Sequence, residues 1–352
     1  MDSVSLTGTG LTIEDVEQVA VRGVPVELAA DAVEQMAAAR ALIDHAVASE
    51  TPTYGVNTGF GRFVDVAISR EDTGRLQLNL LRSHACGVGE PFPTEVVRGA
   101  MLLRANALAT GASGVRRDVV DLLLAMLAAG VHPVVPSRGS LGASGDLAPL
   151  AHLALPLVGE GHAELGGEVL GGADALLRGG LEPLVLEAKE GLALINGTQF
   201  MTAIGALVLV RAHRLARMAD IAAAQSVEAV RGSRTPFSPE IQALRPHPGQ
   251  TASAANLYAL LGDSEINESH RWCGRVQDAY SIRCSPQVHG AARDAIAYAR
   301  SVVAIEVNAA TDNPLVFADR GEVLSNGNFH GEPVAIALDT LKIALAELAG
   351  IS

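Results

Sequence analysis

One short run of the sequence, Ala143-Ser144-Gly145-Asp146, has the residue types needed to build an electrophile out of the chain itself. If the loop bends sharply, the amide nitrogen of Gly145 can attack the carbonyl carbon of Ala143, because glycine has no side chain to block the approach. Loss of water from the ring and of the Ser144 hydroxyl then gives a methylidene-imidazolone with an electrophilic exocyclic carbon. An apolar helical run follows, and the positive end of a helix would sharpen that electrophile. The simpler alternative is an ordinary helix start, with Ser144 or Asp146 as the cap.

A second set of polar residues, Gln277, Tyr280 and Arg283, is spaced by three, so a helix would place them on one side. The guanidinium of Arg283 suits a carboxylate, which it can bind through two parallel hydrogen bonds. Upstream, Tyr54 begins a loop with three glycines (54–61), and such a loop can act as a lid that brings a tyrosine in. For each of these residues taken alone, a structural role is the alternative.

The composition argues against several other kinds of chemistry. The formal net charge is −13 and no basic stripe is present, so nucleic acid is not an expected partner. Lys189 and Lys342 are the only lysines, and neither has the context of a pyridoxal Schiff base. Three cysteines without a CxxC pair indicate neither a disulfide framework nor a zinc site, and no ligand cluster requires a metal. No basic region followed by an apolar stretch opens the chain, so we expect a cytoplasmic protein without a signal peptide.

Apolar residues recur at helical spacing, and aromatic residues make up only 3%, which favours close-packed helices over an aromatic-rich β-sandwich. Thr12 is the expected N-cap of a first helix, and Gly130 the expected stop of another. Residues 160–180 are glycine-rich and predict a small hairpin or a surface excursion. The remaining helical patterns lie at 11–49, 72–84, 94–110, 189–232, 250–263, 265–310 and 333–350.

Residues 191–210 are nearly apolar over a membrane-spanning length, but four polar side chains among them would be penalised by lipid. A helix buried on all sides is therefore expected, and no membrane contact. We expect an N-terminal domain at 1–188 that holds the imidazolone loop, and a central bundle of long helices at 189–352. The apolar face of the last helix ends abruptly, which suggests that the natural chain continues.

The run GSLGASGDLAPLAH (139–152) resembles the signature of the aromatic amino acid ammonia-lyase family. Six further blocks resemble family blocks in the family's order and span nearly all of the chain. They are YGVNTGFG (54–61), RSHACGVGEP (82–91), LINGTQ (194–199), SEINESHRWCGRVQDAYSIRCSPQVHGAARD (264–294), TDNPLVF (311–317) and GNFHGEP (327–333). A chance match of all six is not conceivable, and within the family the chain most resembles members that act on histidine.

The resemblance implies a mainly α fold, a long-helix bundle of the ammonia-lyase/fumarase-like type with a smaller mixed N-terminal region. It implies a homotetramer whose active sites draw residues from different subunits. The implied reaction eliminates ammonia from L-histidine to give trans-urocanate. It needs no external cofactor, because 4-methylidene-imidazol-5-one forms autocatalytically from Ala143-Ser144-Gly145. The family's C-terminal helical part, with an acidic pocket residue, is absent from this chain.

The resemblance also implies roles for single residues. Tyr54 and Tyr280 are implied to be catalytic, the first as a base and the second beside the electrophile. Substrate-binding roles are implied for His84, Asn196, Gln277, Arg283 and Phe329. The sequence departs from the usual histidine-enzyme pattern at Ser285, where Gln is common, and at Asn326, where Gly is common.

Two kinds of rival remain. A tyrosine or phenylalanine ammonia-lyase or aminomutase would use the same electrophile, but such relatives tend to carry His-Leu or Phe-Leu where this chain has Ser83-His84. A polar His84 suits an imidazole, whereas an aryl ring would favour an apolar wall. The other rival is a non-catalytic protein or an inactive fragment with the same fold, against which the intact Ala-Ser-Gly run argues.

Overall fold

The computed structural model describes residues 3–49, 53–59, 68, 70–141 and 145–351. The fold is mainly helical, as predicted, and the chain forms two compact units. Unit 1 comprises Met1–Leu207 and Val303–Ala335, and unit 2 comprises Val208–Val302 and Ile336–Ser352. The units divide the chain after Leu207 and return 303–335 to the first unit, so a domain boundary at residue 188 stays a prediction.

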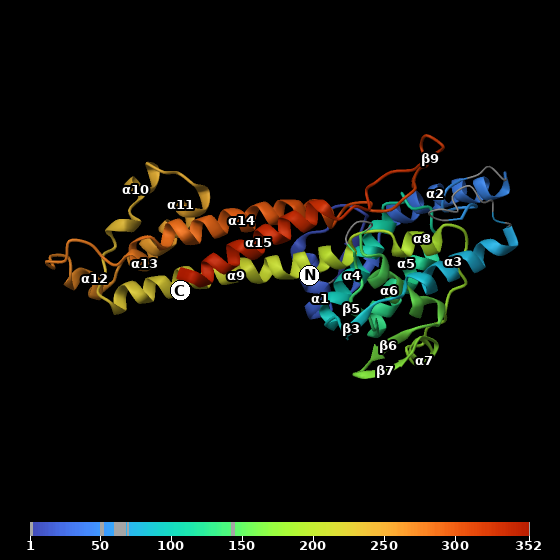
Figure 1. Ribbon diagram of the computed structural model, residues 1–352, viewed down its shortest axis with the longest axis horizontal. Coiled ribbons are helices and arrows are strands. Elements are labelled where there is room, and N and C mark those ends of the chain that lie inside the picture. The colour runs from blue at the N-terminus through green and yellow to red at the C-terminus, as the bar shows by residue number, and fades with distance from the viewer. Residues whose placement is uncertain (1–2, 50–52, 60–67, 69, 142–144, 352) are drawn as a thin grey trace. The chain divides into compact units, whose positions relative to one another are not determined.

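Unit 1 packs short helices and small sheets around a nearly fully buried helix, α4 (Figure 1). Its helices are α1 (Ile13–Arg22), α2 (Ala30–Ala48), α3 (Arg70–His84), α4 (Thr94–Ala109), α5 (Arg117–Ala129), α6 (Leu147–Ala154), α7 (Gly172–Arg178) and α8 (Glu190–Ile195). Its strands are β1 (Val4–Leu6), β2 (Val26–Leu28), β3 (Val88–Pro91), β4 (Val131–Pro133), β5 (Pro136–Arg138), β6 (His162–Leu165), β7 (Glu168–Gly171), β8 (Leu315–Phe317) and β9 (Glu322–Leu324).

Local signals in the sequence set several of these boundaries. The side chain of Thr12 accepts a hydrogen bond from the Asp15 amide, and the Asp15 carboxylate accepts one from the Thr12 amide. Together these two bonds form a complete capping box. Gly130 ends α5 in the left-handed conformation, with φ of 72°. Both predicted boundaries are confirmed.

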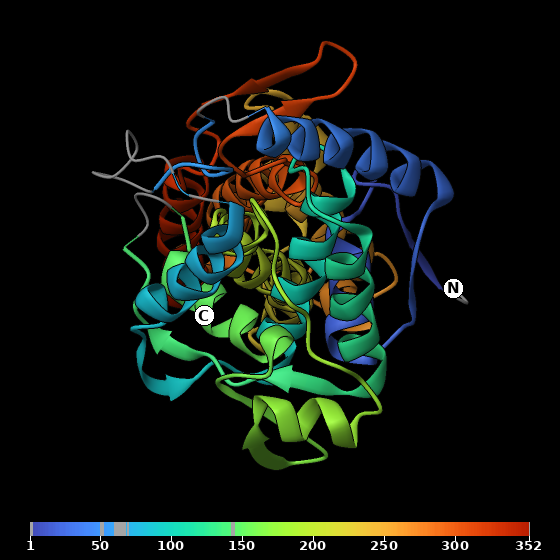
Figure 2. The same cartoon turned by 90° about the vertical axis from the view of Figure 1, so that its right-hand side faces the viewer.

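The predicted excursion at 160–180 is a β-hairpin followed by α7. Strands β6 and β7 pair antiparallel, and Gly166 and Gly167 form the turn with φ of 61° and 86°. Positive φ at both central positions is what a tight hairpin turn requires, which explains the two glycines. The hairpin and α7 lie together at one edge of unit 1 (Figure 2).

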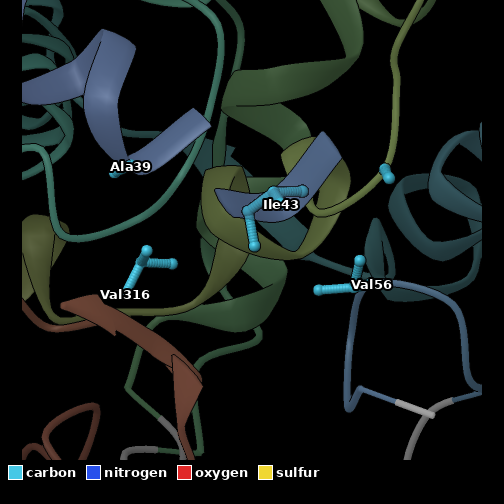
Figure 3. Close-up of a cluster of buried hydrophobic side chains, with 5 residues drawn as sticks. Ala39, Ile43, Val56 and Val316 are labelled. Atoms are coloured by element: carbon cyan, nitrogen blue, oxygen red, sulfur yellow. The ribbon is translucent and has the colours of Figure 1, made fainter. Parts of the chain in front are cut away.

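A cluster of buried aliphatic side chains joins α2 to β8 and to the loop that carries Tyr54 (Figure 3). Its members are Ala39, Ile43, Val56, Ala188 and Val316. Val56 follows Tyr54 by two residues and is fully buried, so the cluster anchors the Tyr54 loop to the core of unit 1.

The apolar segment 191–210 is buried as expected through Phe200, but it is not one helix. α8 ends at Ile195, and α9 (Gln199–Ala229) begins four residues later. Asn196 is extended (φ −93°, ψ 106°), which breaks the helix before Gly197. Within the described residues, no helix combines the length and apolar character that crossing a membrane requires.

Unit 2 contains most of the long helices, and Figure 1 shows α14 and α15 running alongside α9. Its further elements are α10 (Pro239–Ala243), α11 (Pro248–Leu260), α12 (Glu265–Ser269), α13 (Tyr280–Arg283), α14 (Ser285–Glu306) and α15 (Glu332–Ile351). The helix predicted over 265–310 is wrong at residues 270–279, which are not helical and separate the short α12 from α13 and α14. There the buried Asp278 accepts a hydrogen bond from the Ser233 amide at 2.6 Å, so its side chain ties this segment to the end of α9.

Asp220 on α9 holds unit 2 together from within. Its carboxylate accepts hydrogen bonds from Ser253 (2.6 Å) and Asn256 (2.7 Å) of α11. It also contacts His289 (2.9 Å) and Arg293 (2.5 Å) of α14. Burial alone would raise the pKa of Asp220, but these four partners together lower it.

Replacing Asp220 with alanine should lower the free energy of unfolding by about 3–5 kcal/mol, because it leaves Arg293 without its buried carboxylate. Asp339→Ala is the matched control, since Asp339 pairs with Lys342 at the surface and is 77% exposed. Urea denaturation of both variants measures the difference, and equal stabilities would contradict the assigned role of Asp220.

Candidate active site

Gly145 is pressed against the backbone of two other segments. It has φ of 72° and forms an isolated parallel β-bridge with Gly197, while the Asp146 amide donates to the Gly197 carbonyl at 2.6 Å. A Cβ at position 145 would overlap the Gly197 carbonyl and lie 2.9 Å from the Phe329 carbonyl oxygen. Only glycine fits this position, both by conformation and by space. Ala143 and Ser144 lie outside the described residues.

The Asn196–Gly197 turn between α8 and α9 supports Gly145 from the other side. Arg104 of α4 donates from Nη1 to the Asn196 carbonyl at 2.7 Å. The Asn196 amide donates from Nδ2 to Asp312 Oδ1 (3.4 Å) and to the Asn313 carbonyl (3.2 Å). These two acceptors fix the side-chain amide of Asn196 and direct its Oδ1 away from them.

Asp146 occupies the N-cap position of α6 but does not cap that helix with its side chain. Its carboxylate instead accepts a hydrogen bond from the Met201 amide at 2.9 Å, in the first turn of α9, and another from Ser140 at 3.1 Å. Burial raises the pKa of Asp146 to about 6, and these hydrogen bonds oppose the rise only in part. The positive ends of α6 and α9 therefore both lie beside Gly145.

Several charged groups are buried around this turn, and none of them is among the residues predicted for the site. Lys189 and Asp312 form an ion pair of 2.5 Å in which both side chains are fully buried. Burial lowers the pKa of Lys189, which Asp312 opposes, and burial also lowers the pKa of Arg104 to about 10. Glu306 is half-buried and accepts a hydrogen bond from Thr198 at 2.5 Å, and its partial burial raises its pKa. Two features of the sequence could have pointed to these residues. Lys189 is one of only two lysines, and Asp312 lies within the TDNPLVF block.

Two other predicted site residues lie in loops joined to this turn. Gly55, next to Tyr54, has φ of 71°, and a Cβ there would overlap the side chain of Leu192 on α8. Tyr54 lines a cavity of about 460 Å³ together with Pro314 and Ser325. The loop that leads to the half-buried Phe329 is held by Asn313, whose Oδ1 accepts from the Ser325 hydroxyl and the Asn326 amide at 3.2 and 2.8 Å.

His84 is the last residue of α3 and is half-buried. Its Nδ1 lies 3.0 Å from the Leu80 carbonyl oxygen and 3.0 Å from the Ser83 hydroxyl. A carbonyl oxygen only accepts, so a hydrogen bond to it requires the proton on Nδ1. The tautomer with that proton presents Nε2 as an acceptor, which suits a ligand that offers an N–H group.

Gln277, Tyr280 and Arg283 belong to unit 2 and are not on one helix, because α13 begins at Tyr280. Gln277 and Arg283 line the same cavity of about 750 Å³, whose walls include four further arginines. The guanidinium of Arg283 lies 5.5 Å from the centre of the Tyr280 ring, and its Nε is buried without a hydrogen-bond partner among the described residues. The walls also include four acidic residues, so the cavity carries charges of both signs. Over the described ranges, no three His, Cys, Asp or Glu side chains gather where they could hold a metal.

Asp146→Asn should flatten the dependence of stability on pH. The raised pKa favours the protonated acid in the folded state, so its contribution is fully present below the ordinary value of 3.8 and is lost as the pH rises through about 6. The contribution lost is on the order of 3 kcal/mol. Unfolding by urea at pH 4 and pH 7 measures it, with Asp118→Asn, an exposed carboxylate, as the control. An unchanged pH dependence in Asp146→Asn would contradict the assignment.

The sequence and the fold of this chain are similar to those of a known protein family. The sequence matches the family described as aromatic amino acid lyase over residues 11–352. A histidine ammonia-lyase from Gloeobacter violaceus is 59% identical over 351 residues, which are 100% of this chain and 68% of that protein. The structure is similar to tyrosine aminomutase from Streptomyces globisporus (TM-score 0.93, 39% identity, 99% of this chain and 69% of that one). It is also similar to histidine ammonia-lyase from Trypanosoma cruzi (TM-score 0.90, 43% identity, 99% and 65%). The chain belongs to the aromatic amino acid lyase family.

Proposed function

We propose that the protein is a histidine ammonia-lyase, which eliminates ammonia from L-histidine to give trans-urocanate. The observation that carries the proposal is the packing of Gly145 against the Gly197 carbonyl, in a conformation and a space that exclude a side chain. The similarity to the Gloeobacter violaceus enzyme, over the whole of this chain, supports histidine as the substrate.

The electrophile in this proposal is made from Ala143-Ser144-Gly145 and requires no external cofactor. The Gly145 nitrogen bonds to the Ala143 carbonyl carbon, and that carbonyl oxygen leaves as water. The Ser144 hydroxyl leaves as a second water with the α-hydrogen of the same residue, which creates the exocyclic double bond. The residues fit this group, because Gly145 is fixed from behind and helices α6 and α9 direct their positive ends toward it. When formed, the group supplies a carbon that the substrate amine can attack, so that nitrogen becomes a better leaving group.

The other proposed residues bind the substrate and move protons. Arg283 binds the carboxylate with two hydrogen bonds, and Gln277 lines the same cavity. Asn196, held by Asp312 and Asn313, offers its Oδ1 to the amine. Tyr54 takes the β-proton, and Tyr280 exchanges protons with the amine. The β-proton is only weakly acidic, so positioning and charge must supply much of the rate.

His84 and Phe329 complete the proposed pocket. His84 accepts a hydrogen bond at Nε2 from the imidazole N–H of the substrate, because its own proton is held at Nδ1 by the Leu80 carbonyl. A phenyl ring offers no donor at that place, which argues against a phenylalanine lyase or aminomutase, whereas a phenol O–H could also donate to Nε2. Against a tyrosine lyase or aminomutase stands the Ser83-His84 pair, where such relatives tend to carry His-Leu or Phe-Leu, although the fold is similar to tyrosine aminomutase. Incubation with each amino acid, followed by absorbance of the unsaturated product and by chromatography of β-amino acids, separates these activities.

The proposal includes a homotetramer in the cytoplasm, with a small molecule as substrate and neither membrane nor nucleic acid as partner. The net charge of −13 supports the last point, since a phosphate backbone would be repelled. Light scattering of the purified enzyme tests the assembly, and a monomeric mass would contradict it.

Ser144→Ala should abolish the electrophile, because the hydroxyl that leaves as the second water is gone. The intact mass of the enzyme should then lack the deficit of two waters, and the part of the near-ultraviolet absorbance that the imidazolone contributes should disappear. Turnover of histidine should fall by on the order of 10³-fold or more. Ser226→Ala, which removes an exposed hydroxyl on α9, is the control. Unchanged turnover in Ser144→Ala would overturn the proposed chemistry.

His84→Leu should lower kcat/KM for histidine by roughly 10–100-fold, because the imidazole N–H loses its acceptor. Activity on phenylalanine should fall less or rise, since leucine provides the apolar wall that a phenyl ring favours. Steady-state kinetics on both amino acids measure the ratio, with His162→Leu in the β6–β7 hairpin as the control. An equal loss on both substrates would show that His84 does not select the ring.

A further inference from the structure

Arg104 is an unusual residue to find at the centre of unit 1. It lies on α4 and is fully buried, and among the described residues its one hydrogen bond runs from Nη1 to the Asn196 carbonyl. Its Nε and Nη2 are buried without a hydrogen-bond partner in the part of the chain that the structure describes. Burying a guanidinium with two unsatisfied donor atoms costs stability, so the fold alone does not account for this residue.

Neutralising a buried acid does not account for it either. The nearest carboxylate by charge interaction is Asp312, which already has its own partner in Lys189 at 2.5 Å. Arg104 makes no salt bridge of its own among the described residues. Burial lowers the pKa of Arg104 only to about 10, so the group stays charged at neutral pH.

The hydrogen bond from Arg104 to Asn196 is linked to Gly145 through Gly197. The Asn196 carbonyl belongs to the planar peptide that continues into Gly197, so holding that oxygen fixes the orientation of the turn. The Gly197 carbonyl in turn accepts the Asp146 amide, and Gly197 pairs with Gly145. The space at the turn is tight, because a Cβ at Gly197 would lie 3.0 Å from Arg104 Nη1 and 2.7 Å from Thr311 Oγ1.

We propose that Arg104 is a positioning residue for formation of the electrophile: it holds the Asn196–Gly197 turn in the one orientation that keeps Gly145 bent for ring closure. This inference rests on the proposed function. A charged donor suits the task, because its hydrogen bond to a carbonyl in a buried site is stronger than that of a neutral donor.

Two arginines of the same helix provide a matched comparison. Arg104→Met removes the charge and the donor but keeps an unbranched side chain, and it also removes two unsatisfied donors, so the melting temperature should change little. Arg98→Met removes hydrogen bonds to the carbonyls of Val19, Ala20 and Leu127, so it should lower the melting temperature. Arg98 has no hydrogen bond to the Asn196–Gly197 turn.

The fraction of chains with the ring is measured as the mass deficit of two waters and as near-ultraviolet absorbance, beside the melting temperature. We expect Arg104→Met to reduce this fraction about tenfold or more at a nearly unchanged melting temperature. Arg98→Met should show the reverse, a lower melting temperature with the ring intact. Arg104→Lys, which keeps a charged donor, should recover part of the fraction lost in Arg104→Met.

Each outcome decides between the two ideas. A wild-type enzyme without the mass deficit would overturn the proposed function, and with it the role of Arg104. A wild-type enzyme with the ring and an Arg104→Met variant with an undiminished ring would overturn only the role of Arg104. Loss of the ring in proportion to melting temperature in both methionine variants, or no recovery in Arg104→Lys, would also overturn it, because the residue would then be merely structural.

Discussion

The contact between Gly145 and the carbonyl of Gly197 is the constraint on which the rest of the site depends. It joins the start of α6 to the break between α8 and α9, and it admits no side chain at position 145. The extended conformation of Asn196 interrupts the helix in the apolar segment. This break presents the side-chain amide of Asn196, and it also places the Gly197 carbonyl where it accepts the hydrogen bond from the Asp146 amide. A continuous helix over 191–210 would remove both.

The charged groups around that contact explain how so irregular a turn is held in place. Arg104 donates to the backbone carbonyl of Asn196, and Asp312, which is paired with Lys189, accepts from the Asn196 side chain. At the start of α9, Asp146 accepts from the Met201 amide and Glu306 accepts from the Thr198 hydroxyl. Each buried charge is costly by itself, and pairing repays that cost only with good geometry. Because several of these groups share partners, their contributions will not be additive.

The sequence predicted the family, the mainly helical fold and the residues of the proposed pocket, because these depend on local patterns and on recognisable blocks. The cap at Thr12, the stop at Gly130 and the glycine-rich hairpin follow from local backbone chemistry and were therefore predictable. The division of the chain into two units was not, since segment 303–335 returns to unit 1 through contacts far along the chain.

Other features could not be predicted because distant partners decide them. The non-helical stretch before Tyr280 depends on Asp278 reaching the Ser233 amide, and no periodicity records that bond. The role of Asp146 depends on the Met201 amide, 55 residues away, rather than on its own helix. Arg104 has no signal at all in a single sequence, since an arginine in an apolar helix is ordinarily expected at the surface.

Cleavage at the two lysines described above can be used to measure local unfolding of the chain. Lys189 is fully buried in unit 1, and Lys342 lies on α15 in the part assigned to unit 2, with a side chain that is 81% exposed. A lysine-specific endoproteinase needs an extended segment, so cleavage after Lys342 requires local opening of α15, whereas cleavage after Lys189 requires the core of unit 1 to open. Because these are the only two lysines, one digest reports the opening of α15 and the opening of the core of unit 1 as separate bands, without any introduced label.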